Sequence, residues 1–226
     1  MMSRPTIPTV QEMWPDPILE FKEKGSDSKD LIFLSVGRVC TTWEIIETNL
    51  GFIFGQFAES NSSASQRAYG VISNTSGRHD ALQMAAEIYH DRHYKFPIEQ
   101  FKSLMKLYTK AASYRNRIAH GLATEFMKED NLSLGFFLVP SSFSSKHKIA
   151  PTFAFWQKVS DSKDEFYVHG NAYRFTHEDI DFLESKLQFL NELLGYFASD
   201  LVASRVERTM RTGREFMHDV RGDDEH

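Results

Sequence analysis

The chain has 226 residues, of which 41% are hydrophobic and 25% are charged, and its formal net charge is −5. This composition is typical of a folded globular domain and excludes a disordered chain. The negative charge also excludes a protein that coats DNA, so any surface that binds nucleic acid has to be a local basic patch.

The number of cysteines and the length of the apolar runs indicate the cellular compartment. Cys40 is the single cysteine, which excludes an internal disulfide and a cysteine-based metal cluster. The opening residues carry no apolar run with a small-residue cleavage site, and we find no clean apolar run of about 18 residues. These features predict a cytoplasmic protein without a membrane span.

The first predicted elements are an arm and a long helix. Residues 1–29 are rich in proline and charge and predict an extended arm, with a helix beginning near Ser28 or Asp30. Apolar residues then recur every three or four positions to about residue 59, which indicates a helix. They are Ile32, Val36, Val39, Trp43, Ile46, Leu50, Ile53 and Phe57.

Two more helical regions follow. The first covers residues 66–92 and is interrupted near 73–77, where the sequence reads SNTSG. The second begins at Pro97, because proline suits the first turn of a helix. Its apolar side includes Phe101, Leu104, Leu107 or Tyr108, Ala111, Ile118 and Leu122.

The chain then changes character. Residues 131–175 form short aromatic and β-branched runs between Pro, Ser, Asp and Gly clusters, the pattern of strands. Helix returns with a capping-box-like start at Thr176 and Asp179. We therefore predict a mainly α, up-and-down helical bundle over residues 30–215. It carries a small β hairpin or meander as an insert before the last long helix, and residues 216–226 form a polar tail.

The segment SYRNRIAHG contains the candidate site. Arg115 falls on the apolar stripe of its helix, four residues after Ala111 and three before Ile118. A guanidinium on a buried stripe is costly unless it meets an anion or a polar cleft. His120 lies about 140° around an ideal helix from Arg115, whereas Asn116 forms an i,i+4 pair with His120. A structural salt bridge and a solvated histidine are the alternative interpretations.

The string YRNRIAHG resembles the signature of the HEPN superfamily. That signature is an arginine followed after four to six residues by a histidine, and a polar residue commonly comes directly after the arginine. Arg115, Asn116 and His120 match it in order, and TTWEIIETNL is similar to a stretch of the first helix of such bundles. The resemblance covers residues 31–126 and 176–205. It implies a metal-independent endoribonuclease without cofactors, acting as a homodimer on RNA in a stress, defence or toxin role. A neutralising partner protein is a further expectation.

The same resemblance implies roles for the motif. His120 would move a proton to or from the 2′-hydroxyl or the leaving 5′-oxygen, and Arg115 would bind the scissile phosphate. Asn116 would orient His120 or the phosphate. Many related toxins have a tyrosine two residues after the histidine as a target for nucleotide addition. Leu122 occupies that position here, so silencing by that route is not expected.

Weaker candidates lie elsewhere. Glu47, with Glu44 as the competitor, is expected to pair with Arg115. Contacts to RNA are predicted for Arg117 and for an arginine ridge near the end of the chain, with a solvated C-terminal turn as the alternative for the ridge. The ridge consists of Arg205, Arg208, Arg211 and Arg214. His90 and His93 have the spacing of a metal pair but no visible third ligand, so we predict a solvated helix end and no metal site. Five aromatic residues are candidates for base stacking or for packing: Phe153, Phe155, Trp156, Phe166 and Tyr167.

Two other readings of the chain stay open from the sequence. A non-catalytic HEPN-like module that binds RNA, a nucleotide or a partner protein fits the acidic net charge and the missing tyrosine. A purely structural helical protein would match the motif by chance, since R-x-x-x-x-H is a short pattern.

Overall fold

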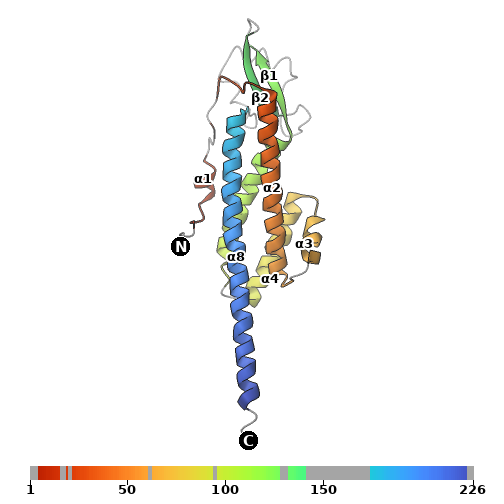
Figure 1. The fold of residues 1–226 in the computed structure, drawn as a ribbon, viewed down its shortest axis with the longest axis vertical. Helices are drawn as coiled ribbons and strands as arrows, with labels where there is room; N and C mark the ends of the chain where they lie inside the picture. Colours follow the sequence, from red (N-terminus) through yellow and green to blue (C-terminus); the bar gives the residue numbers. More distant parts are fainter. Residues whose placement is uncertain are drawn as a thin grey trace. The chain divides into compact units, whose positions relative to one another are not determined.

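The computed structural model describes residues 5–15, 19, 22–60, 63–93, 96–127, 132–140 and 174–222. These residues are mainly helical, and a two-stranded sheet precedes the last long helix, which confirms the predicted fold class (Figure 1). The elements in chain order are α1 (Val10–Met13), α2 (Lys29–Phe57), α3 (Ser63–Gly70), α4 (Thr75–Arg92), α5 (Ile98–Ala119), β1 (Gly121–Met127), β2 (Ser133–Pro140) and α8 (His177–Gly222). No helix in the described ranges is long and apolar enough to cross a membrane.

Side-chain caps set where several helices begin. The Ser28 hydroxyl accepts a hydrogen bond from the backbone N–H of Asp30 at 3.1 Å, which confirms the predicted start of the first long helix. Asn74 caps α4 in the same way, through the N–H of Gly77. The interruption predicted near residues 73–77 is therefore real: it separates α3 from α4.

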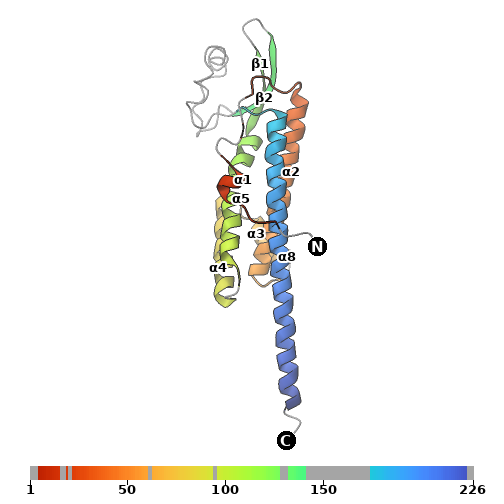
Figure 2. The ribbon, with the colours of Figure 1, turned by 90° about the vertical axis from the view of Figure 1, so that its left-hand side faces the viewer.

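The chain divides into two compact units, each of which contains parts of α2, α5 and α8. We call residues 1–7, 46–105 and 191–226 the α3–α4 unit, and residues 8–45 and 106–190 the sheet unit. In the α3–α4 unit, α4 runs beside the first turns of α5 (Figure 2). Its core centres on the ring of Phe57, which contacts four other aromatic rings within 6.4 Å: Tyr89, Phe96, Phe101 and Phe197.

The core of the sheet unit is built on two stacked ring pairs. Trp43 of α2 stacks on Tyr108 of α5 with centroids 5.2 Å apart, and Trp14 stacks on Tyr114 at 5.1 Å. All four rings are buried. The start of α8 lies beside α2 in this unit, since the Thr42 hydroxyl donates to the Glu184 carboxylate at 2.7 Å.

The sheet differs from the prediction in where it begins. Strand β1 starts at Gly121 and pairs antiparallel with β2, with Gly121 opposite Pro140. Leu122, predicted on the apolar stripe of a helix, lies in this strand and is 52% exposed, so that prediction is wrong. Glycine is a poor helix former, and at position 121 a Cβ would come within 2.6 Å of the Leu138 side chain. The helix ends at Ala119 instead.

Short bridges cover the second edge of β2. Ser26 pairs with Phe136, and Phe175 pairs with Leu138, each through two backbone hydrogen bonds of 2.7–3.0 Å. An edge strand covered in this way is protected from pairing with other chains. The predicted strand run at 132–140 is confirmed, while the other runs of the insert lie outside the described residues.

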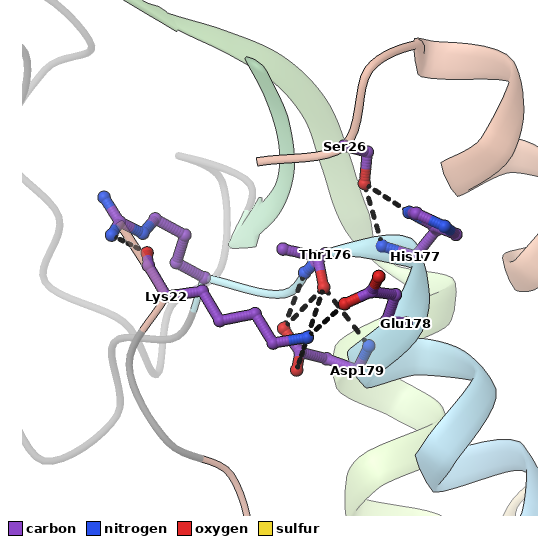
Figure 3. Close-up of polar contacts among 7 residues, drawn as sticks. Lys22, Ser26, Thr176, His177, Glu178 and Asp179 are labelled. Carbon is purple, nitrogen blue, oxygen red and sulfur yellow. Dashed lines mark hydrogen bonds and ion pairs between the residues drawn. The ribbon is translucent and has the colours of Figure 1, made fainter. Parts of the chain in front are cut away.

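The predicted arm is not extended throughout, since α1 forms within it after a capping box of Thr9 and Glu12. The later part of the arm is anchored to the start of α8 (Figure 3). Lys22 Nζ lies 2.7 Å from the Glu178 carboxylate and 3.2 Å from that of Asp179. The Ser26 hydroxyl accepts a 2.9 Å hydrogen bond from the backbone N–H of His177. Thr176 and Asp179 exchange hydrogen bonds, which confirms the predicted capping box. The arm is thus tied to the sheet unit by ion pairs and hydrogen bonds.

Candidate functional site

The last turns of α5 place Arg115 against an aromatic face. Its neighbours on the stripe, Ala111 and Ile118, are buried, whereas Arg115 is half-buried. The Arg115 guanidinium carbon lies 5.7 Å from the ring centroid of Trp43. A cation over an indole ring gains about 0.5–2 kcal/mol, depending on how far water is excluded. The Trp43 ring therefore stabilises the positive charge of Arg115 on the stripe.

The described residues of the sheet unit use only part of the hydrogen-bonding capacity of Arg115. Its Nη1 donates to the Asn116 side-chain oxygen at 3.2 Å, and its buried Nε–H has no acceptor among the described residues of the sheet unit. A guanidinium carries five N–H donors. Further N–H donors on its Nη atoms thus remain for an anion. The contact with Asn116 orients the planar guanidinium.

His120 is the first residue after α5. Its backbone N–H still bonds to the Asn116 carbonyl at 3.1 Å, but the residue lies in a turn and is exposed. Because this hydrogen bond continues the helical pattern to His120, the separation of about 140° from Arg115 on an ideal helix is not removed within one chain. The exposed imidazole is open to a ligand.

Tyr114 carries a second set of basic contacts in the same helix turns. The guanidinium of Arg117 lies 5.4 Å from the Tyr114 centroid, and the Lys110 ammonium lies 5.5 Å from it. The ring is also stacked on Trp14 of the arm. Sequence reasoning missed both residues: the i,i+4 spacing of Lys110 and Tyr114 could have indicated the first, whereas only the fold brings Trp14 to this ring. Arg115, Arg117 and Lys110 make this end of α5 positively charged.

Glu47 has a structural partner that the sequence did not indicate. Its carboxylate lies 2.8 Å from Arg78 Nη1 and accepts a 3.3 Å hydrogen bond from the Tyr69 hydroxyl. Burial, and next the Glu47 charge, raise the pKa of Tyr69 well above its ordinary value, so the phenol stays a donor. These contacts tie α2 to α3 and α4. The pairing with Arg115 joins residues of the two units and stays a prediction.

The histidine pair His90 and His93, predicted as a solvated helix end, makes side-chain contacts instead. His93 Nε2 lies 2.8 Å from the Glu59 carboxylate, whereas His90 Nδ1 lies 3.2 Å from the Phe96 carbonyl, so the two histidines have different partners. No group of three or more His, Cys, Asp or Glu side chains in the described part of the chain is placed to hold a metal ion. The five candidate stacking aromatics of residues 153–167 lie outside the described residues.

Arginines of α8 lie close to α4 and the end of α2. Arg205 donates to the Gln56 amide oxygen at 3.5 Å and to the Glu59 carbonyl at 3.2 Å. Arg208 donates to the Tyr89 hydroxyl and lies over that ring. Arg211 is exposed on the same helix.

Comparison with protein-family models, with curated proteins and with solved structures finds no match to this chain. We therefore infer the function from the motif and from the geometry around it.

Proposed function

We propose that the chain is a metal-independent endoribonuclease with a HEPN-like site formed by Arg115, Asn116 and His120, in a stress, defence or toxin role. The observation that supports this most is the half-buried Arg115 guanidinium, held by Trp43 and Asn116, followed five residues later by an exposed imidazole. A guanidinium held in place to bind phosphate, together with a histidine that can move a proton, is the minimum that RNA cleavage requires.

The proposed reaction is an internal transfer of the phosphodiester. The 2′-hydroxyl of the substrate attacks the adjacent phosphorus, the new 2′-oxygen–phosphorus bond forms, and the bond to the 5′-oxygen breaks. One proton leaves the 2′-hydroxyl and one arrives on the 5′-oxygen, so the products are a 2′,3′-cyclic phosphate and a 5′-hydroxyl. His120 moves one of these protons, and Arg115 stabilises the negative charge on the phosphate oxygens.

One imidazole cannot take one proton and donate another at the same moment, and the proposed homodimer supplies the second. In a two-fold assembly, His120 of each protomer would serve the same cleft, as the HEPN resemblance implies. Mixing wild-type and His120→Ala chains is informative here. If both imidazoles serve one cleft, mixed dimers are inactive and an excess of the variant suppresses the wild-type activity, whereas two independent sites leave the activity of each wild-type chain unchanged.

The test is cleavage of a labelled RNA in EDTA by the wild type and by His120→Ala. We expect the variant to lose at least about 100-fold in rate, since general acid–base groups contribute roughly 10²–10⁴. His79→Ala is the matched control: this histidine lies in α4, its ring contacts Asp80 at 3.4 Å, and its loss should not change the rate. RNA binding without cleavage by the wild type would instead favour a non-catalytic binding module.

A further inference from the structure

The Trp43 ring lies between two residues of α5 that are seven positions apart. Tyr108 and Arg115 point in nearly the same direction, because seven residues make almost two helical turns and advance about 10.5 Å along the axis. The Trp43 ring centroid lies 5.2 Å from that of Tyr108 and 5.7 Å from the Arg115 guanidinium carbon. These two separations together match the spacing along the helix, so the indole is inserted between the two side chains.

Steric exclusion assigns the two faces of the indole. The Tyr108 ring is nearly parallel to the Trp43 ring, with 16° between their planes, so it covers one face. The Arg115 guanidinium therefore takes the opposite face. Between the two residues on this side of α5 lie Ala111 and Ala112, which are buried and small enough to leave room for the ring. We call Tyr108, Trp43 and Arg115 the α5 stack; all three belong to the sheet unit.

The α5 stack fixes the plane of the guanidinium. Tyr108 is 0% exposed and Trp43 is 3% exposed, so packing holds the indole in place. A guanidinium that lies on a fixed ring can turn within the plane of its face but cannot tilt freely. The hydrogen bond from Arg115 Nη1 to the Asn116 side-chain oxygen restricts that remaining rotation. The ring and the amide are both neutral, so neither of them cancels the charge of Arg115.

We propose that Trp43 is a positioning residue, which holds the Arg115 guanidinium in the orientation in which its remaining Nη donors meet a phosphate group. The proposal rests on the proposed function in taking an RNA phosphate as the ligand of Arg115, but it requires no cleavage. A guanidinium fixed before the substrate arrives loses less conformational freedom when the substrate binds. Trp43 thus acts on the reaction through Arg115 and does not contact the RNA itself.

The experiment changes the electron density of the Trp43 ring and preserves its shape. Trp43 is replaced site-specifically by tryptophan that carries one, two or three fluorine atoms on the benzo ring. Each fluorine withdraws electrons from the face of the ring and weakens its attraction for a cation. Because fluorine is only slightly larger than hydrogen, the buried ring still fits between Tyr108 and Arg115, and the protein should fold.

Two readouts follow the substitution in EDTA: the rate of cleavage of a labelled RNA, and the affinity of a fluorescein-labelled 2′-O-methyl RNA, which lacks the attacking hydroxyl. We expect the rate and the affinity to fall stepwise with the number of fluorine atoms, by about fivefold for three, within the range that a partly desolvated cation–π contact supplies. Melting curves are recorded for every protein.

The same fluorinated series at Trp14 is the matched control. Trp14 is also buried, at 1% exposure, and it also stacks on a tyrosine of α5, with its centroid 5.1 Å from that of Tyr114. Fluorination at Trp14 should leave the rate and the affinity unchanged, since Trp14 is not the ring beneath Arg115. A role of Trp43 in core packing alone would shift the melting curves of both series and leave the affinity for RNA unchanged.

Each outcome decides the proposal. Stepwise losses confined to the Trp43 series support the positioning role. An unchanged rate and affinity in the Trp43 series, equal losses in the Trp14 series, or no binding of RNA at all would overturn it. If the wild type does not cleave RNA but the affinity for 2′-O-methyl RNA still falls in the Trp43 series, the proposed nuclease fails and the positioning role stands.

Discussion

Arg115 is the residue on which the proposed chemistry depends, and its environment explains why arginine occupies this position. The guanidinium is flat, lies over the Trp43 ring with its carbon 5.7 Å from the centroid, and bonds to Asn116 through one of its five donors. A lysine would keep the charge but lose both the stacking surface and the fork. At this position the two basic residues are therefore not equivalent.

Replacing Arg115 by lysine should consequently leave the protein folded and reduce RNA cleavage by about 100-fold or more, the loss typical of a removed transition-state donor. Initial cleavage rates, together with melting curves, measure both effects. Arg117→Lys is the control for a general loss of arginine near the site, and we expect a smaller effect from it. A full rate in Arg115→Lys would show that the fork is not used.

Glu59 gives a pH-dependent contribution to stability. The hydrogen bond from His93 is the main cause that lowers the pKa of Glu59 below its ordinary 4.5, and Arg92 lowers it further. Because the folded pKa is lowered, this contribution is fully present above about pH 4.5 and disappears as the pH falls through the folded pKa. The side chain is 40% exposed, so solvent screening limits the contribution to about 1 kcal/mol or less.

We therefore expect Glu59→Gln to be less stable than the wild type at pH 6–7, with the difference shrinking below about pH 4.5 as the wild-type carboxylate protonates. Urea unfolding at several pH values measures the difference. Glutamine keeps the backbone conformation and the length of the side chain, so only the charge changes. An equal difference at pH 7 and pH 3 would contradict the ionic origin.

At the scale of elements, the junction between α5 and β1 sets the position of His120. Gly121 packs directly on the buried Leu138 side chain, at a distance that leaves no room for a Cβ. Gly121→Ala should destabilise the protein by about 1–3 kcal/mol through overpacking. Gly37→Ala is the matched control, since nothing lies within 4 Å of a Cβ there and alanine should be neutral or stabilising in the middle of α2. An unchanged unfolding midpoint in Gly121→Ala would contradict this account of the junction.

Local signals allowed the helices to be predicted, but long-range contacts decided the rest. The Ser28 start, the break before α4 and the Thr176 cap depend on residues close in sequence. The end of α5 was misplaced by three residues because Leu122 continued the apolar spacing, while the competing strand pairing with Val139 is a distant contact. Propensity yields to such tertiary contacts.

The site could be predicted only as a motif. The order of Arg115, Asn116 and His120 is visible in the sequence. The contacts of Trp43 with Arg115 and of Trp14 with Tyr114 exist only in the folded chain. Likewise, the partner of Glu47 is Arg78, 31 residues further on, and no periodicity indicates it. Distant contacts of this kind leave no pattern in a single sequence.

At the scale of the whole molecule, the net charge of −5 and the proposed binding of RNA are compatible because the basic residues are concentrated locally. The sheet unit has Lys110, Arg115 and Arg117 at one end of α5, and the α3–α4 unit has Arg92, Arg205 and Arg208 near the ends of α2 and α4. We expect RNA binding to weaken steeply with salt, since released counterions supply much of the affinity.

The most direct measurement compares one RNA with its 2′-O-methyl counterpart, incubated with the wild type and with His120→Ala in EDTA, and determines the fragment masses. The account predicts that only the wild type cuts, that only the unmodified RNA is cut, and that the fragments end in a 2′,3′-cyclic phosphate. Cleavage of the methylated RNA, or equal cleavage by His120→Ala, would contradict a mechanism in which His120 serves an attacking 2′-hydroxyl.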